Sequence, residues 1–159
     1  MDAAGLRYFK DWRRRMPLGI TVITTRLPDG GVHGLSTEAV MSVSQEPPMV
    51  LFFLGRRAGT YDNIQREGRF GMSILEAHQL NWSEYFSTQP RPPRMPGGLH
   101  TAPSGVAAVD DCLAFFDCRK VAQYQVGEST MLVVGEVDDI EVTEGSPLIY
   151  LAGEYLTAV

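Results

Sequence analysis

Gly34 to Phe53 read GLSTEAVMSVSQEPPMVLFF, and this segment carries more information about the fold than any other part of the chain. Small and hydroxyl-bearing side chains near its start let the backbone lie close to another group, and alternating apolar residues leave one face of a strand for burial. The prolines at 47 and 48 end that strand just before a fully apolar one begins at Met49. The segment therefore predicts a binding edge on a β-barrel.

Composition predicts a globular protein without affinity for nucleic acid. The 159 residues are 44% hydrophobic and 21% charged, with a net charge of -5. A chain of this length is most simply one domain, here expected to span 1–159, and its negative charge offers no general attraction for phosphate backbones. No apolar run reaches the roughly 18 residues of a membrane span, and no secretory leader is evident, so we expect a cytoplasmic protein without membrane contact. Cys112 and Cys118 are predicted to share a strand and to stay reduced and buried.

The residues before the opening segment predict a helix and a hairpin. Asp2 to Met16 place apolar side chains at helical spacing, and Pro17 ends the pattern. Ile20 to Thr25 are rich in β-branched residues and predict a strand. The turn sequence at 28–31 then predicts a hairpin, with a returning strand from Val32 to Val43.

The residues after it predict strands separated by short helices. Met49 to Leu54 are continuously apolar, as in a central strand. Thr60 is expected to be the N-cap of a short helix that ends at Gly68. A strand over Phe70 to Leu75 and a second helix over Ala77 to Phe86 follow.

The rest of the chain begins with a proline-rich segment, 87–104, which predicts a loop. A linker between two domains is the alternative, but the roughly 55 residues beyond it would form a marginal domain. Strand-like runs follow over 107–122, 130–142 and 148–151. Many short strands, short helices and no βαβ alternation predict an all-β barrel with small α additions.

The order of these pieces resembles the flavin reductase-like family, the flavin-binding split barrels that include reductase components of two-component monooxygenases. No single piece is specific, but their order and spacing agree over most of the chain. The matching pieces are 19–25, 34–48, 69–75, 135–137, 147–150 and 153–155. The resemblance implies an antiparallel Greek-key split β-barrel of six or seven strands with peripheral short helices. It also implies a homodimer with flavin at the subunit boundary.

The resemblance directs attention to residues that suit a flavin. An isoalloxazine ring needs an apolar slot with backbone donors and acceptors, which Ser36, Thr37, Glu38, Ala39 and Val40 would supply. The phosphate needs cations or N–H groups, and we assign it to three residues around the start of the first short helix, Arg56, Arg57 and Thr60. The alternative is that Thr60 only caps the helix and the arginines are solvated.

Two positions of this segment depart from the family pattern. Glu38 stands where a small hydroxyl or amide residue is more frequent, and a carboxylate repels phosphate unless it turns away or pairs with Arg56 or Arg57. Ala58 stands where a serine is frequent. Both weaken the assignment of the phosphate site and leave the fold assignment untouched.

A third departure concerns the electron donor. Many family members carry Gly-Asp-His on a late turn associated with nicotinamide binding, and here the matching residues are Gly127, Glu128 and Ser129. Serine offers neither a ring nor a cation to a dinucleotide. Hydride transfer itself needs no side-chain acid or base, because flavin and nicotinamide carry the chemistry. An ordinary hairpin turn is the alternative interpretation of these three residues.

The histidines do not predict a metal site. His33, His78 and His100 lack the close spacing of metal ligands, so no metal and no catalytic side chain are expected. His78 follows a region that lies near the flavin in the family, so we count it among the candidate cofactor-binding residues, with a solvated or capping histidine as the alternative.

The resemblance thus implies an NAD(P)H:flavin oxidoreductase that binds FMN or FAD and either keeps the reduced flavin or releases it to an oxygenase partner. One alternative is a flavin-binding carrier without reductase activity, which the missing histidine favours. A second is a barrel-fold interaction protein without flavin, which Glu38 and Ala58 favour. The sequence alone does not choose FMN over FAD or NADH over NADPH.

Overall fold

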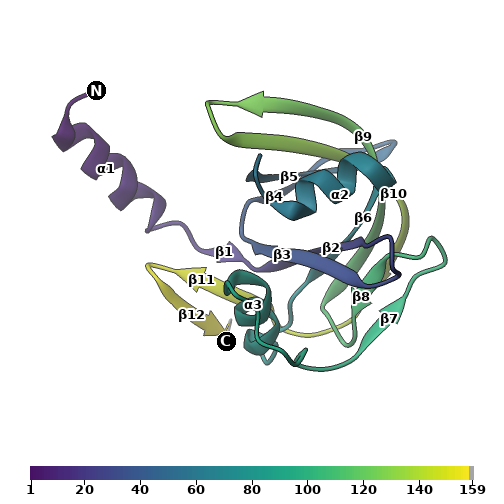
Figure 1. The fold of residues 1–159 in the computed structure, drawn as a ribbon. Coiled ribbons are helices and arrows are strands. Elements are labelled where there is room, and N and C mark those ends of the chain that lie inside the picture. The colour runs from purple at the N-terminus through teal and green to yellow at the C-terminus, as the bar shows by residue number, and fades with distance from the viewer. Residues whose placement is uncertain (158–159) are drawn as a thin grey trace.

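The computed structural model describes residues 1–157, which form a strand-rich body with a helix projecting from it (Figure 1). Its helices are α1 (Ala3–Arg13), α2 (Gly59–Glu67) and α3 (Leu80–Ser87). Its strands are β1 (Leu18–Gly19), β2 (Thr21–Arg26), β3 (Val32–Thr37), β4 (Val40–Gln45), β5 (Pro48–Gly55), β6 (Arg69–Ile74), β7 (Leu99–Thr101), β8 (Ala107–Val109), β9 (Ala114–Val126), β10 (Thr130–Val142), β11 (Leu148–Leu151) and β12 (Glu154–Thr157).

One antiparallel sheet forms the main body, and over the described residues it has seven strands in the order β3-β2-β6-β9-β10-β5-β4. Its edge strands β3 and β4 are consecutive in sequence, so the sheet curls round until its edges meet at Glu38 and Ala39. The prediction of an antiparallel all-β fold with short peripheral helices is confirmed. β6 pairs with β9, so strands from both sides of the proline-rich segment share this sheet.

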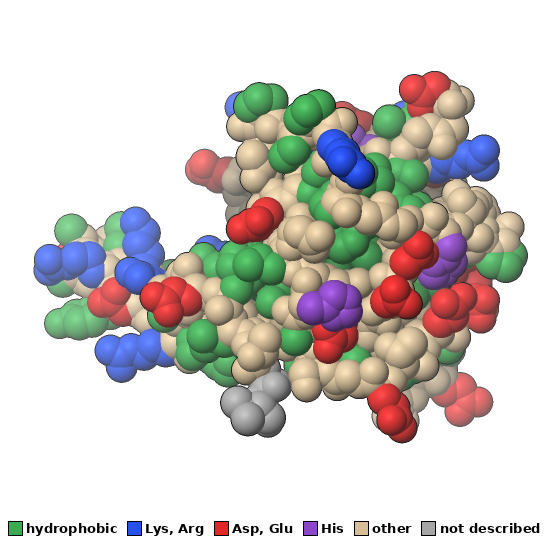
Figure 2. Space-filling view, turned by 90° about the horizontal axis from the view of Figure 1, so that it is seen from below, with side chains coloured by type: hydrophobic (Ala, Val, Ile, Leu, Met, Phe, Trp, Pro, Cys, Tyr) green, Lys and Arg blue, Asp and Glu red, His purple; other side chains and the backbone are tan. Residues whose placement is uncertain are grey.

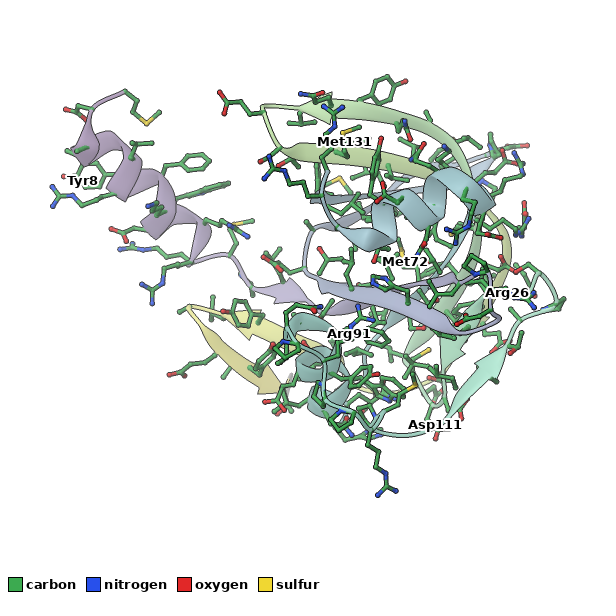
Figure 3. All side chains as sticks on the ribbon, in the orientation of Figure 1. Tyr8, Arg26, Met72, Arg91, Asp111 and Met131 are labelled. Atoms are coloured by element: carbon green, nitrogen blue, oxygen red, sulfur yellow. The ribbon has the colours of Figure 1, made fainter. Side chains whose placement is uncertain are left out.

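The inside of the curled sheet is an apolar core. It gathers Ile23, Phe52, Phe70, Met72 and Val133, all of them 0% exposed. The labelled Met72 and Met131 lie within the barrel (Figure 3). A second core packs α3 and the β7–β8 hairpin against the other end, where Trp82 and Phe86 stack with ring centroids 5.8 Å apart.

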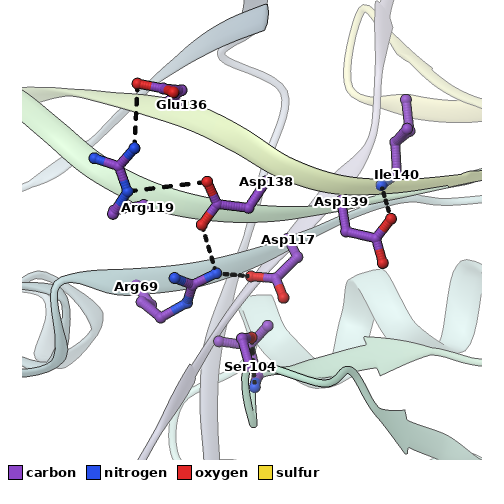
Figure 4. Close-up of polar contacts among 9 residues, drawn as sticks. Arg69, Ser104, Asp117, Arg119, Glu136, Asp138, Asp139 and Ile140 are labelled. Carbon is purple, nitrogen blue, oxygen red and sulfur yellow. Dashed lines mark hydrogen bonds and ion pairs between the residues drawn. The ribbon is translucent and has the colours of Figure 1, made fainter.

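An ion-pair network ties three neighbouring strands together on the outside of the barrel (Figure 4). The Arg69 guanidinium on β6 donates to Asp117 on β9 at 2.9 Å and to Asp138 on β10 at 2.8 Å. Asp117 is only 2% exposed. Burial opposes the charge on Arg69, but the two carboxylates outweigh it and raise the pKa of the guanidinium. Arg69 therefore stays cationic and holds the three strands in register.

Four sequence predictions need correction. The strand expected over Val32–Val43 is two strands, because the ladder stops at Thr37 and resumes at Val40. The proline-rich segment is not entirely a loop, since Leu99–Thr101 pair with β8. Cys112 precedes β9 rather than sharing it with Cys118, although both are free and buried as expected.

The fourth correction concerns Thr60. The N-cap of α2 is Ala58, which forms no side-chain cap, and Thr60 lies inside the helix with 0% exposure. The Thr60 hydroxyl faces the barrel, 3.0 Å from Nδ1 of His33. Because this hydroxyl points inward, it does not accept from the first N–H groups of the helix.

Candidate functional site

The curled sheet brings the segment 36–40 and the arginines at 56 and 57 to one end of the barrel. The β3–β4 link places Ala39 beside β5, where the Phe53 N–H donates to the Ala39 carbonyl at 3.1 Å. β5 then runs directly into Arg56 and Arg57, which precede α2. The segment 36–40 and the two arginines therefore lie at the same end of β5.

The turn assigned to nicotinamide lies at the same end. Gly127 to Ser129 connect β9 and β10, and Gly127 adopts the left-handed conformation with φ of 63° that such a tight turn favours. The Arg56 N–H donates to the Ser129 carbonyl at 2.8 Å. The Arg56 side chain also donates to Gln125 on β9 at 3.2 Å. Arg56 thus contacts both the turn and the strand that leads into it.

The hydroxyl groups of Ser36 and Thr37 are already engaged. Ser36 lies 3.1 Å from the Ser83 hydroxyl on α3, which in turn lies 3.0 Å from the Tyr155 hydroxyl. The Thr37 hydroxyl accepts from the Ala39 N–H at 3.1 Å and so shapes the link between β3 and β4. What this link can offer a ring is mainly backbone, because Glu38 and Ala39 lie outside both strands.

Glu38, the acidic residue that departs from the family pattern, forms an ion pair with a residue that the sequence did not suggest. Arg13 at the end of α1 donates to the Glu38 carboxylate at 2.7 Å. The carboxylate pairs with neither of the expected partners, Arg56 and Arg57, so both guanidinium groups keep their charge for another anion. The residues present therefore fit a phosphorylated flavin better than the sequence alone indicates.

A cavity of about 780 Å³ lies on the other side of the β3–β4 link. Its walls come from α1, β3, α3 and the β11–β12 hairpin, and include Lys10, Arg13, Arg14, Ser36, Glu38, Ser83, Tyr150 and Tyr155. Basic side chains and two tyrosines whose ring centroids lie 5.2 Å apart suit a ligand with both a ring and an anionic group. The run of arginines at residues 13–15 was the only sign in the sequence of this basic wall. The sequence does not show how α1 is oriented relative to the barrel, so it could not place these arginines beside β3.

Two predicted residues are placed apart from this group. His78 contacts the Glu76 carboxylate, which also accepts from the His78 N–H at 2.9 Å and from Ser146 at 3.4 Å. The His78 N–H donation lowers the pKa of Glu76. His78 thus forms a local contact before α3, and the structure does not bring it to Arg56 and Arg57. Thr60 lies near the arginines in sequence, but its hydroxyl faces His33 inside the barrel.

The His33 imidazole below α2 is neutral. Burial lowers the pKa of His33, and the positive charge of Arg91 lowers it further. Arg91, labelled in Figure 3, donates to the Gly34 carbonyl and lies over the Phe86 ring, 5.1 Å from its centroid. A neutral ring can accept from or donate to the Thr60 hydroxyl, so this pair supports α2 rather than binding an anion.

Other kinds of centre find no support within residues 1–157. No group of three His, Cys, Asp or Glu side chains is arranged to hold a metal ion. No helix there has the length and apolarity needed to span a bilayer. His100 does lie 2.8 Å from Asp110, a pair that the sequence did not predict. Cys112 lines the same pocket, but burial raises the pKa of its thiol, which donates to the Ala114 carbonyl at 3.4 Å.

The sequence profile of the family described as "Flavin reductase like domain" matches residues 13–158. An NADH-dependent flavin reductase of Rhodococcus sp is 31% identical over 89% of this chain and 80% of its own. The reductase component of 4-hydroxyphenylacetate 3-monooxygenase of Thermus thermophilus is 32% identical over 92% of this chain and 93% of its own.

Solved structures agree in fold over the whole chain. The flavin reductase PheA2 in its native state superposes with a TM-score of 0.88 at 34% identity, covering 100% of this chain and 99% of that one. The profile match reaches from the end of α1 through β12 and therefore includes every strand that walls the cavity. On the fold and these comparisons together, the chain belongs to the flavin reductase-like domain family.

Proposed function

We propose that this protein is an NAD(P)H-dependent flavin reductase that binds FMN at the end of the barrel formed by the β3–β4 link, Arg56 and the β9–β10 turn. The observation that carries the proposal is the meeting of these three segments at one end of the barrel, in a chain whose family relatives are named flavin reductases. No side chain of that end is needed as an acid or base, because a bound flavin itself accepts the hydride.

Each segment has a distinct task in this proposal. Backbone groups of Glu38, Ala39 and Val40 hold the ring, and Ser36 and Thr37 fix the shape of that backbone through their hydroxyl contacts. The phosphate binds to the guanidinium groups of Arg56 and Arg57 and to N–H groups at the start of α2. Thr60 contributes only its backbone, since its hydroxyl faces His33, and His78 is left out of the site.

The turn of Gly127, Glu128 and Ser129 borders the nicotinamide. The hydrogen bond from the Arg56 N–H to the Ser129 carbonyl supports this assignment, because Arg56 belongs to the proposed flavin site. Stacking of nicotinamide on the ring is the orientation that hydride transfer requires, and the turn limits where the dinucleotide can lie. Ser129 provides no ring for additional stacking, so nicotinamide binding relies on the flavin and on the backbone of this turn.

The names of the relatives suggest where the reduced flavin goes. One of them is a reductase component of a monooxygenase, and we propose that this chain likewise passes reduced flavin to an oxygenase in the cytoplasm. We further propose that it works as a homodimer. FMN is preferred to FAD in this proposal because the arginines beside α2 suit a terminal phosphate.

Anaerobic titration of the purified protein tests the function. With FMN bound, we expect the yellow absorbance to bleach when NADH or NADPH is added. A protein that stays yellow would instead be a carrier, the alternative favoured by the absent motif histidine. A protein that fails to quench the fluorescence of added FMN would refute flavin binding altogether.

A matched pair of variants tests the site. The double variant Arg56→Ala/Arg57→Ala should raise the Kd for FMN at least tenfold, because it removes both phosphate cations. Arg66→Ala removes a cation from the opposite end of the same helix and should leave the Kd unchanged. Equal Kd values for the two variants would exclude Arg56 and Arg57 from the site.

A further inference from the structure

Helix α2, at whose start we place the flavin phosphate, has no side-chain cap. Its N-cap residue is Ala58, which cannot accept a hydrogen bond through its side chain, although Ser, Thr, Asp or Asn usually does so at this position. Gly59 is exposed, and its N–H donates to no acceptor among the described residues. The packing of the first turn, rather than a cap, therefore fixes the direction of its N–H groups.

His33 on β3 packs against this first turn from the barrel side. Its Nδ1 lies 3.0 Å from the hydroxyl of Thr60, a residue that is 0% exposed. At Gly59, an added Cβ would lie 3.2 Å from Nε2 and 3.3 Å from Cε1 of the same imidazole ring. The ring therefore contacts two successive residues of the turn, one through a hydrogen bond and one through close packing.

The backbone that carries this ring is held by its neighbours. His33 pairs with Thr25 on β2, and the His33 carbonyl accepts from the Thr25 hydroxyl at 3.3 Å. Arg91 donates to the carbonyl of the next residue, Gly34. Burial and the charge of Arg91 lower the pKa of His33, so the neutral imidazole acts on α2 by contact rather than by charge.

A second buried polar contact joins α2 to the sheet, one turn further along the helix. The Asn63 side-chain amide donates to the Thr25 hydroxyl at 3.2 Å, and Asn63 is 6% exposed. This contact anchors the same helix to β2, but it lies beyond the first turn. Of the two contacts, only the one at His33 therefore involves the residues whose N–H groups would meet the phosphate.

We propose that His33 is a positioning residue for the flavin phosphate. From behind the helix, through Thr60 and Gly59, it holds the N–H groups at the start of α2 in the direction that an anion requires. Helix ends fray, and an anion binds best to N–H groups that already point toward it. The inference rests on the phosphate site of the proposed function and adds to it a residue that lies behind the helix rather than against the ligand.

Binding of FMN and of riboflavin tests the proposal, because riboflavin has the same ring and no phosphate. Thr60→Val removes the hydroxyl and keeps a branched side chain, and His33→Leu removes the ring nitrogens. Each should raise the Kd for FMN about threefold to tenfold, the effect of one lost hydrogen bond, and leave the Kd for riboflavin unchanged. The double variant should lose no more affinity than either single variant, since both remove one contact. Quenching of flavin fluorescence measures each Kd.

Two further variants separate positioning from stability. His33→Asn should restore most of the affinity for FMN, because its amide places a polar atom where Nδ1 of the imidazole lies. Asn63→Ala is the matched control, because it removes a buried polar contact from the same helix beyond the first turn. It should lower the free energy of unfolding in urea and keep the ratio of the two Kd values at the wild-type level. Circular dichroism checks that each variant is folded.

General attraction by cations is the alternative cause of a preference for FMN over riboflavin. Figure 2 shows blue side chains gathered on the projecting helix α1, whose last turn contains Lys10 and Arg13. Because the His33 imidazole is neutral, His33→Leu leaves all of these charges unchanged. Added salt should therefore weaken FMN binding by the same factor in the wild type and in this variant. A different salt dependence would assign the effect to charge and refute positioning.

The outcomes distinguish failure of this inference from failure of the proposed function. If His33→Leu and Thr60→Val leave the Kd for FMN unchanged, or weaken FMN and riboflavin equally, His33 does not position the phosphate site, and the flavin site itself stands. If Asn63→Ala changes the ratio of the two Kd values as much as His33→Leu does, general anchoring of α2 is responsible. A wild type that binds FMN and riboflavin equally tightly would refute the phosphate assignment, and one that binds neither would refute the proposed function, in both cases together with this inference.

Discussion

At the scale of single residues, the pairing of Arg13 with Glu38 changes the interpretation of the flavin site. Glu38 alone argues against a phosphate nearby, and the sequence offered Arg56 and Arg57 as its possible partners. The structure instead supplies a cation from a helix 25 residues earlier. No local pattern predicts such a contact, because it depends on how α1 leaves the barrel.

The Arg13–Glu38 pair is open to a direct test. Arg13→Ala should raise the Kd for FMN about 2–5-fold, equivalent to up to about 1 kcal/mol, because it leaves a free carboxylate beside the site. Fluorescence titration of FMN measures the change. Adding Glu38→Gln to Arg13→Ala should restore the wild-type Kd, since no repulsive charge remains.

Arg7→Ala is the control for this test, because it removes the same charge from α1 at another position. It should leave the Kd near the wild-type value. If Arg7→Ala weakens binding as much as Arg13→Ala does, the general charge of the helix is responsible rather than the contact with Glu38.

At the scale of elements, strand β3 packs closely between β2 and α3 because Gly34 has no side chain. A Cβ there would lie 2.5 Å from the Ile23 carbonyl oxygen and 2.9 Å from Cε1 of Phe86. The residue that begins the most informative segment of the chain is thus a glycine for reasons of packing. Its neighbours Ser36 and Thr37 can only reach α3 and the β3–β4 link if β3 stays this close.

Gly34→Ala should therefore destabilise the protein by about 1–3 kcal/mol, because backbone on one side and an aromatic ring on the other must move apart. Gly19→Ala serves as the matched substitution, since a Cβ at Gly19 would have no atom within 4 Å. Urea denaturation of both variants measures the free energy of unfolding. Similar losses at the two positions would contradict the packing argument.

Elements could be predicted from the sequence wherever one local cause dominates. Glycine at 68 correctly ends α2, and β-branched and apolar runs correctly give β2 and β5, whereas α1 ends at Arg13, before the expected stop at Pro17. The N-cap at Thr60 was wrong because its hydroxyl finds a partner, His33, on a distant strand. The same holds for the candidate site. Arg56 and Arg57 could be identified because they directly precede a predicted helix. The cavity walls from α1, Tyr150 and Tyr155 could not, because they depend on tertiary packing.

At the scale of the whole molecule, burial of titratable groups links stability to pH. Burial raises the pKa of the Cys118 thiol from 9.0 to about 12, with Asp117 adding to the effect. Below the ordinary value the thiol is protonated in both the folded and the unfolded chain. Above it, the unfolded chain releases the proton while the folded chain retains it, so stability falls as pH rises.

This linkage predicts a measurable difference between the wild type and Cys118→Ala. One pH unit above the ordinary thiol pKa, the wild type should have lost about 1.4 kcal/mol more of its free energy of unfolding than the variant has, relative to neutral pH. Urea denaturation at the two pH values measures both losses, and the other titrating groups are common to the two proteins. Identical losses would show that the thiol ionises freely in the folded state.

The pairing of β1 with β11 joins Leu18 to Tyr150, and the hairpin of β11 and β12 walls the cavity beside the β3–β4 link. On the ribosome, β1 emerges long before its partner strand is made. The cavity consequently lacks this wall until β11 and β12 have been made and paired with β1. A ligand can be retained there only after synthesis has passed these two strands.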